Sequence, residues 1–264
     1  MPFLFVDNAR FPLFLILVLA AVGGAAIVGL IMAHKRQQAL RELAVSKGMK
    51  FARHDPFQLP NVFGQTKLCS VGRSRKARNV IFGPCSEGDL RYFDYKYTIR
   101  SGKHSHTYRF GACGVQTDCH FKPMIVRREG LFDKVAGFFG FDDVDLDHGE
   151  FNRRFYVHCE DKKFAYDVLT QRAMQFFLDR RWLSMEIRWN YILFYRQGTP
   201  KVHDVSRLLD DAQTFVKMLP DYFKDDRAMR QQRGPDSRRH QVPSSRREGV
   251  RFEGIEPERR EKRS

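Results

Sequence analysis

The sequence lacks the short motifs that identify the common enzyme classes. It contains no G-x-S-x-G, no P-loop and no G-x-G-x-x-G, so it gives no support for an esterase nucleophile, a nucleotide-phosphate loop or a dinucleotide-binding turn. Cysteine is scarce, and its odd number of positions follows no disulfide or zinc-binding spacing: Cys69, Cys85, Cys113, Cys119 and Cys159. We therefore expect reduced thiols in a cytosolic compartment, and we expect no cofactor.

Charge is missing from one long stretch, Phe11 to Ala33. At 1.5 Å per residue a helix of this length covers roughly 33 Å, which is enough for a hydrocarbon core of about 30 Å. A cleaved signal peptide would need a basic start and a shorter apolar run, whereas Asp7 and Arg10 are the charged residues of the first ten. The stretch therefore predicts a retained single-pass transmembrane helix over 11–33.

Positive charge is abundant elsewhere, with a net charge of +15 and a pI near 9.8. A chain this basic is expected to have an anionic partner, either nucleic acid or a membrane surface. Basic residues crowd the segment just after the apolar stretch, against a single Glu42, and they include Lys35, Arg36 and Arg41. The positive-inside rule then places residues 1–10 outside and residue 34 onward in the cytoplasm of a cell membrane. We expect these three side chains to contact anionic lipid headgroups.

Small residues recur every fourth position inside the apolar stretch, at Ala21, Ala25 and Gly29. Such a stripe lets two helices approach closely, so one expectation is a homodimer through this helix. Small residues are also common in membrane helices that do not associate, and the two interpretations stay open.

The remainder predicts an α+β fold, in which an antiparallel sheet is covered by helices. A basic juxtamembrane helix should span 34–47, the α+β domain 48–222 and a disordered basic tail 223–264, whose few apolar residues cannot offset the entropy of ordering. Alternating or helical periodicity predicts a strand near 79–82, a strand over 151–159, an antiparallel pair at 184–189 and 191–195, and helices over 131–139, 162–178 and 205–219. Asp161 stands at the expected N-cap of the second helix.

The clearest strand pattern is a hairpin over 92–112 with a polar turn at its centre. Tyr95, Tyr97, Tyr108 and Phe110 should face one core, and His104 should lie in water at the tip.

A metal site at this turn would need His104 and His106 together with Cys113, Cys119 or His120. The spacing of these residues suits a zinc site poorly, because Cys113 has the opposite strand parity. Calcium is disfavoured at Asp143, Asp145 and Asp147, because position 6 of the loop is His148 and position 12 is Arg154. A strand with one solvated acidic face is the simpler interpretation, and we predict no metal ligand.

A second basic cluster, "GRSRKAR", should form a loop carrying Arg73, Arg75, Lys76 and Arg78. It is either a contact for lipid headgroups and phosphate or simply a solvated loop. The basic tail could bind RNA, but from Arg227 onward its arginines are interspersed with acids and Phe252 is the one aromatic residue. We therefore do not expect nucleic acid to be a partner.

Two stretches resemble a group of uncharacterised bacterial membrane proteins that join one or two transmembrane helices to a soluble domain of unknown function. They are "EFNRRFYVHCEDKKFAYDVLTQRAMQFFL" followed by "EIRWNYILFY", and "GRSRKARNVIFG" followed by "YFDYKYT". In the first, Phe151, Phe155 and Val157 would lie on a strand, with Leu169 and Thr170 on a helix. The resemblance implies a bacterial origin and a membrane address, and it brings no catalytic residues.

The sequence therefore predicts a single-pass membrane-anchored protein whose cytoplasmic α+β domain binds or scaffolds something at the membrane, with lipid and a protein as candidate partners. The first alternative is a membrane-tethered enzyme, a thiol-dependent or metal-dependent hydrolase whose partners meet only in space. The second is a nucleic-acid binder that acts through its tail.

Overall fold

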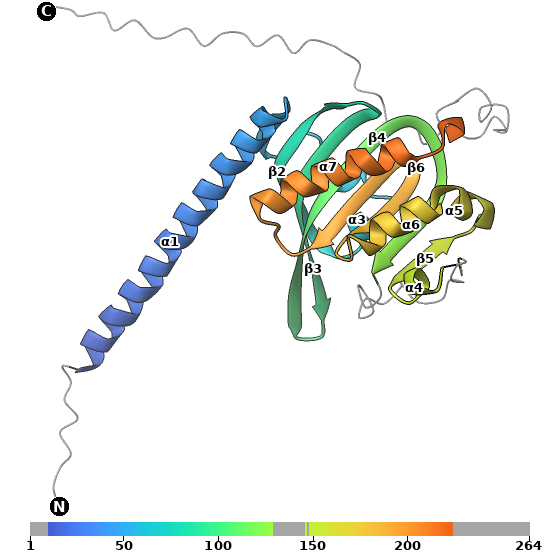
Figure 1. The fold of residues 1–264 in the computed structure, drawn as a ribbon. Coiled ribbons are helices and arrows are strands. Elements are labelled where there is room, and N and C mark those ends of the chain that lie inside the picture. Colours follow the sequence, from blue (N-terminus) through green and yellow to red (C-terminus); the bar gives the residue numbers. More distant parts are fainter. Residues whose placement is uncertain (1–9, 129–145, 147, 224–264) are drawn as a thin grey trace, which may run out of the picture.

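The computed structural model describes residues 10–128, 146 and 148–223. Its first element is one unbroken helix, α1 (Arg10–Ser46), which joins the apolar stretch to the basic segment after it (Figure 1). Its apolar side chains are exposed, as at Leu19, Leu30 and Met32, and none of its most apolar part is buried inside the protein. A helix of this length and composition could cross a bilayer, which fits a membrane-associated protein.

An antiparallel sheet of six strands follows, as the sequence predicts for an α+β fold. The strands run in the order β1-β2-β3-β4-β5, and β6 pairs with the long strand β4. Their bounds are β1 Lys50–His54, β2 Arg73–Cys85, β3 Gly88–Ser101, β4 His104–Arg128, β5 Phe155–Cys159 and β6 Ser184–Gln197. The helices after α1 are α2 Leu59–Val62, α3 Lys67–Ser70, α4 Gly149–Asn152, α5 Lys162–Val168, α6 Gln171–Leu178, α7 Val202–Met218 and the 3₁₀ helix η1 Asp221–Phe223.

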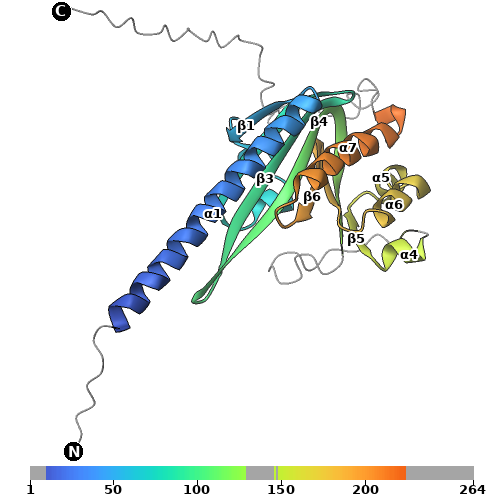
Figure 2. The same cartoon turned by 60° about the vertical axis from the view of Figure 1, so that its left-hand side comes forward.

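Both faces of the sheet carry a hydrophobic core. Successive residues of a strand point to opposite faces, and Tyr92 of β3 belongs to one core while its neighbour Phe93 belongs to the other. The first core includes the C-terminal end of α1, together with α5, α6 and α7, which cover that face (Figures 1 and 2). The second is smaller, rich in aromatic rings and covered by α2 and α3.

The predicted hairpin is confirmed as β3 and β4, joined by a turn at Gly102 and Lys103. Tyr95 pairs with Phe110 and Tyr97 with Tyr108, all on the face of the second core. His104 at the tip is exposed, as expected. Figures 1 and 2 both show this hairpin projecting from the sheet toward the side where the N-terminal end of α1 lies.

The prediction of a loop over 72–78 is wrong, because this basic segment forms the first half of β2. Two irregularities in the pairing of β2 with β3 hid this half of the strand from the sequence pattern, whereas the strand predicted near 79–82 is confirmed as part of β2. Ser74 and Asn79 lie at them with φ of 53° and 51°, a left-handed conformation that residues other than glycine seldom adopt. Each irregularity shifts the alternation of side chains by one position.

The single helix expected over 162–178 is in fact two, α5 and α6. Asp161 is confirmed as the N-cap of α5, since its side chain accepts a hydrogen bond from the Phe164 N–H. Thr170 caps α6 in the same way, so it lies at a helix boundary rather than within a helix. Phe151 lies in α4 rather than on a strand, although it is fully buried.

The two short strands expected at 184–189 and 191–195 form one strand, β6, which pairs with β4 along both halves. Trp189 has φ of 54° at a shift in this pairing, so the chain bulges there instead of turning back. The helix predicted over 205–219 is confirmed as α7. The helix expected over 131–139, the acidic side chains Asp143, Asp145 and Asp147, and the tail after Phe223 lie outside the described residues.

Candidate binding site beside the membrane helix

The candidate site begins at an ion pair between α1 and the sheet. Arg36 donates two hydrogen bonds to Asp94 of β3, from Nη1 to Oδ2 at 2.5 Å and from Nη2 to Oδ1 at 2.9 Å. The second nitrogen also donates to the Pro200 carbonyl oxygen at 3.1 Å. A forked contact of this kind fixes both the distance and the orientation of the guanidinium, so it holds the C-terminal part of α1 against the sheet.

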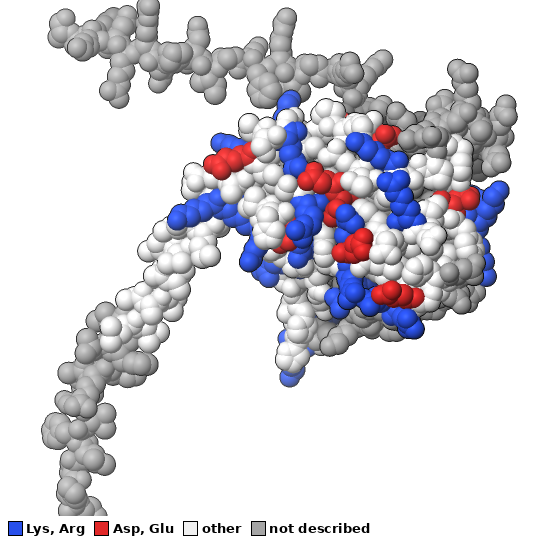
Figure 3. Space-filling model, in the orientation of Figure 1, with Lys and Arg blue, Asp and Glu red and all other residues white. Residues whose placement is uncertain are grey.

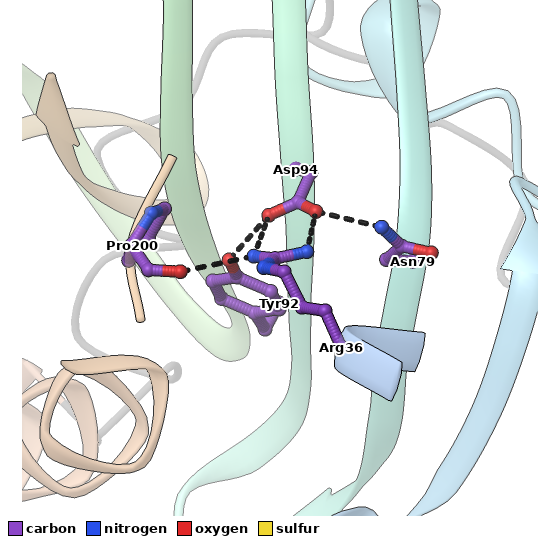
Figure 4. A network of polar contacts seen from close by, with 5 residues as sticks. All are labelled: Arg36, Asn79, Tyr92, Asp94 and Pro200. Carbon is purple, nitrogen blue, oxygen red and sulfur yellow. Dashed lines mark hydrogen bonds and ion pairs between the residues drawn. The ribbon is translucent and has the colours of Figure 1, made fainter. Parts of the chain in front are cut away.

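Asp94 accepts two further hydrogen bonds (Figure 4). The Tyr92 hydroxyl donates to Oδ1 at 2.6 Å, and Asn79 Nδ2 donates to Oδ2 at 2.8 Å. Burial, and then the neighbouring Asp94 carboxylate, raise the pKa of Tyr92 well above its ordinary value, so its hydroxyl keeps the proton that it donates. With Arg36, these partners balance the negative charge of Asp94.

Gly111 makes room for this arrangement. It lies directly opposite Asp94 on β4, and a Cβ atom at this position would come within 2.3 Å of Pro200 Cγ. No side chain fits there without moving Pro200, whose carbonyl oxygen binds Arg36. Glycine is therefore required at this position by close packing.

A pocket of about 220 Å³ adjoins the ion pair. We call it the basic pocket, because lysine, arginine and polar side chains supply most of its lining. The lining residues are Lys76, Arg78, Asn79, Asp94, Tyr95, Lys96, Arg109, Phe110 and Thr199. Strand register explains the concentration of charge. Lys96 lies directly opposite Lys76 on one side and Arg109 on the other. These three residues, the basic row, cross β2, β3 and β4 on one face of the sheet.

The basic row is unfavourable for the fold by itself. Directly opposite residues of an antiparallel pair have Cβ atoms roughly 4.5–5.5 Å apart, and like charges at this distance destabilise the pairing. Within residues 10–128, 146 and 148–223, Lys76, Arg78, Lys96 and Arg109 form no ion pair with a carboxylate. Asp94, the acidic residue of the lining, is already neutralised by Arg36. The arrangement can therefore attract and hold an anion.

The structure separates the basic residues that the sequence singled out. Lys76 and Arg78 line the basic pocket, whereas Arg36 is engaged inside the protein and Arg75 donates to the Cys69 carbonyl oxygen at 2.6 Å. Lys35, Arg41 and Arg73 are exposed. Figure 3 shows lysine and arginine side chains gathered where α1 meets the domain, while the part of the helix beyond that point that is drawn in white shows no charged side chain.

Two residues of the site, Lys96 and Arg109, were missed by sequence reasoning. Their signal was present, since both alternate with the buried aromatic residues of the hairpin and so had to lie together on the opposite face. The pairing of Lys96 with Lys76 could not be predicted from the sequence, because two irregularities interrupt the register between β2 and β3.

The other candidates do not come together with this site. Ala21, Ala25 and Gly29 lie on the exposed surface of α1. His104 and His106 are exposed near the hairpin tip, whereas Cys113 is buried in the first core. The five cysteines are free thiols. Across the part of the chain that the structure describes, no three His, Cys, Asp or Glu side chains cluster closely enough to hold a metal ion.

Comparison with protein families and with curated proteins gave no match. Among solved structures, the chain is similar to a crystal structure of the mycobacterial trehalose monomycolate transport factor A, TtfA. The two are 15% identical, the match covers 70% of this chain and 96% of that one, and the TM-score is 0.47. A likeness at this level carries no inference about function.

Proposed function

We propose that this protein is a single-pass membrane-anchored binding module, whose α+β domain is held at the cytoplasmic surface of the bilayer. The observation that carries the proposal is the contact between Arg36 and Asp94, because it joins the apolar helix directly to the sheet. A domain attached through a flexible linker would have no fixed position relative to the lipid. This domain is attached through a helix that does not break between the two parts.

The position of Arg36 supports a location at the headgroup layer. It follows the last residue of the apolar stretch, Ala33, by three positions, which is about 4.5 Å along a helix. The headgroup region adds roughly 5–7 Å to each side of the hydrocarbon core. The side of the domain that binds Arg36 is therefore expected to adjoin the headgroups.

The distribution of charge supports the cytoplasmic side. Basic residues follow the apolar stretch closely and are almost absent before it, a bias that retains the basic flank in the cytoplasm. The exposed residues Lys35 and Arg41 would then face the anionic leaflet.

Membrane fractionation and protease protection of the full chain test this proposal. We expect a C-terminally tagged protein to stay in the membrane pellet after alkaline carbonate washing, and we expect protease to reach the domain only from the cytoplasmic side. A matched protein lacking residues 1–33 should move to the soluble fraction. Recovery of the full chain as a soluble protein, or cleavage of the domain from the outer side of sealed cells, would refute the proposal.

A further inference from the structure

We propose that the basic pocket binds the phosphate group of an anionic membrane lipid. The inference rests on the proposed function for its setting, since it requires the domain to lie against a bilayer. It goes further by naming a ligand class and the residues that hold it, Lys76, Lys96 and Arg109 with Arg78.

The first argument is charge. Three cations lie in register on adjacent strands, which destabilises the sheet unless an anion lies between them. The one carboxylate in the lining already binds Arg36, Tyr92 and Asn79. Phosphate matches the remaining donors well, because lysine binds it as a point charge and arginine presents a planar fork of N–H groups.

The second argument is depth. Lys96 follows Asp94 by two residues in the direction of the hairpin tip, roughly 6–7 Å along the strand. The hairpin projects toward the side on which the N-terminal end of α1 lies (Figures 1 and 2). The basic row therefore lies on the bilayer side of the ion pair with Arg36, which is about 4.5 Å past the end of the apolar stretch. The backbone of the row then lies near the edge of the hydrocarbon core, and its long lysine and arginine side chains can extend outward to the headgroup phosphates.

The third argument is size. The volume of about 220 Å³ is below the roughly 300–1,000 Å³ of pockets that enclose drug-sized ligands. Such a pocket can take a headgroup phosphate while the acyl chains stay in the bilayer. A soluble phosphate compound would gain nothing from this location, so we assign the lipid as the source.

Native mass spectrometry of the full chain, released from non-ionic detergent micelles, tests the inference. Phosphatidic acid and diacylglycerol with the same acyl chains serve as probes, because they differ only in the phosphate. We expect adducts with phosphatidic acid and few with diacylglycerol. The double variant Lys96→Gln/Arg109→Gln should bind phosphatidic acid at least tenfold more weakly, because two of the side chains that hold the phosphate lose their charge.

The matched control is Lys162→Gln/Lys163→Gln, which removes the same charge from exposed positions on α5. It should bind phosphatidic acid as the unaltered protein does. Equal losses in both double variants would overturn the inference, because they would show a diffuse attraction without a pocket. A third arm adds inorganic phosphate, and displacement of the lipid at equal concentration would overturn the lipid assignment in favour of a soluble ligand.

Folding and location are measured on the same samples. The pocket variant removes a repulsion, so its thermal midpoint should be no lower than that of the unaltered protein. If all variants remain in the membrane pellet but the unaltered protein does not prefer phosphatidic acid, only the lipid inference fails. A protein found in the soluble fraction would instead refute the proposed function.

Discussion

Arg36 and Asp94 lie 58 positions apart in the chain and are joined by two hydrogen bonds, of 2.5 and 2.9 Å. One residue belongs to the helix that carries the apolar stretch, and the other to β3, the first strand of the hairpin. Both side chains are mostly shielded from solvent, with exposures of 22% and 18%. An ion pair at this depth is stronger than one on the open surface. Leu40 and Ala44 add apolar packing to the same contact, and Lys47 adds an exposed ion pair to Asp210 of α7.

Replacing Arg36 by Gln should loosen α1 from the sheet. Asp94 would keep Tyr92 and Asn79 but lose its charged partner, so we expect the free energy of unfolding to fall by about 1–3 kcal/mol. Hydrogen exchange in residues 34–46 should become faster in the detergent-solubilised protein. Lys35→Gln removes the same charge from an exposed neighbour and should leave exchange unchanged. Equal exchange in both variants would show that the ion pair does not hold the helix.

Gly111→Ala should disturb the same site from the opposite side. The added methyl group would overlap Pro200 Cγ, and overpacking of this kind typically destabilises a protein by about 1–3 kcal/mol. Thermal unfolding measures the effect. Gly149→Ala is the control, because a Cβ atom there meets nothing within 4 Å. The packing argument would be wrong if the two substitutions had the same effect.

Lys96→Gln should stabilise the protein when no anionic lipid is present. It removes the central charge of the basic row, and each like-charge pair costs roughly 0.2–1 kcal/mol. The gain should shrink as salt is added, because ions screen charges at the protein surface. Thermal unfolding at about 20 mM and about 1 M salt measures both effects. A lower midpoint for the variant at low salt would contradict the repulsion that we assign to the row.

Asp161→Ala should destabilise α5 by about 0.5–2 kcal/mol through loss of the N-cap. Asp161→Asn should cost less, since it retains a capping oxygen. The hydrogen bond from Lys122, followed by that from the Phe164 N–H, lowers the pKa of Asp161 below its ordinary 3.8. The carboxylate therefore stabilises the fold above pH 3.8, and this contribution is lost as the pH falls through the lowered value.

Chemical denaturation across that pH range checks the prediction. The difference in stability between the unaltered protein and Asp161→Asn should close as the pH falls. A difference that stayed constant down to the lowest pH would show that the charge of Asp161 has no part in the cap.

Local patterns predicted the elements in which one periodicity runs undisturbed. The hairpin could be read because aromatic residues alternate from Phe93 to Tyr97, and α7 because apolar residues recur at helical spacing from Val205 to Val216. The cap at Asp161 is local as well. In each case the residues that decide the structure lie within a few positions of one another.

The remaining features, which are the bulges, the strand register and the ion pair, depend on contacts between residues far apart in the sequence. Ser74, Asn79 and Trp189 adopt positive φ because the sheet around them contains a bulge. Of the three residue types, asparagine alone is enriched in this conformation, and one asparagine does not predict a bulge. Register between β2 and β3 follows from those bulges, so the basic row was hidden. Arg36 was expected at lipid headgroups because its partner Asp94, far along the chain, could not be foreseen.

The unbroken course of α1 has a consequence for rotation. A helix turns by about 100° per residue, so every side chain inside the apolar stretch points in a direction fixed by the residues at Arg36 and Leu40 that hold the sheet. A helix that packed against the stripe at Ala21 and Gly29 would therefore always have the domain in the same orientation about the axis of α1. One residue inserted between Ala33 and Arg36 would rotate the domain relative to the stripe by about 100°, more than a quarter turn, without changing the residues of either part.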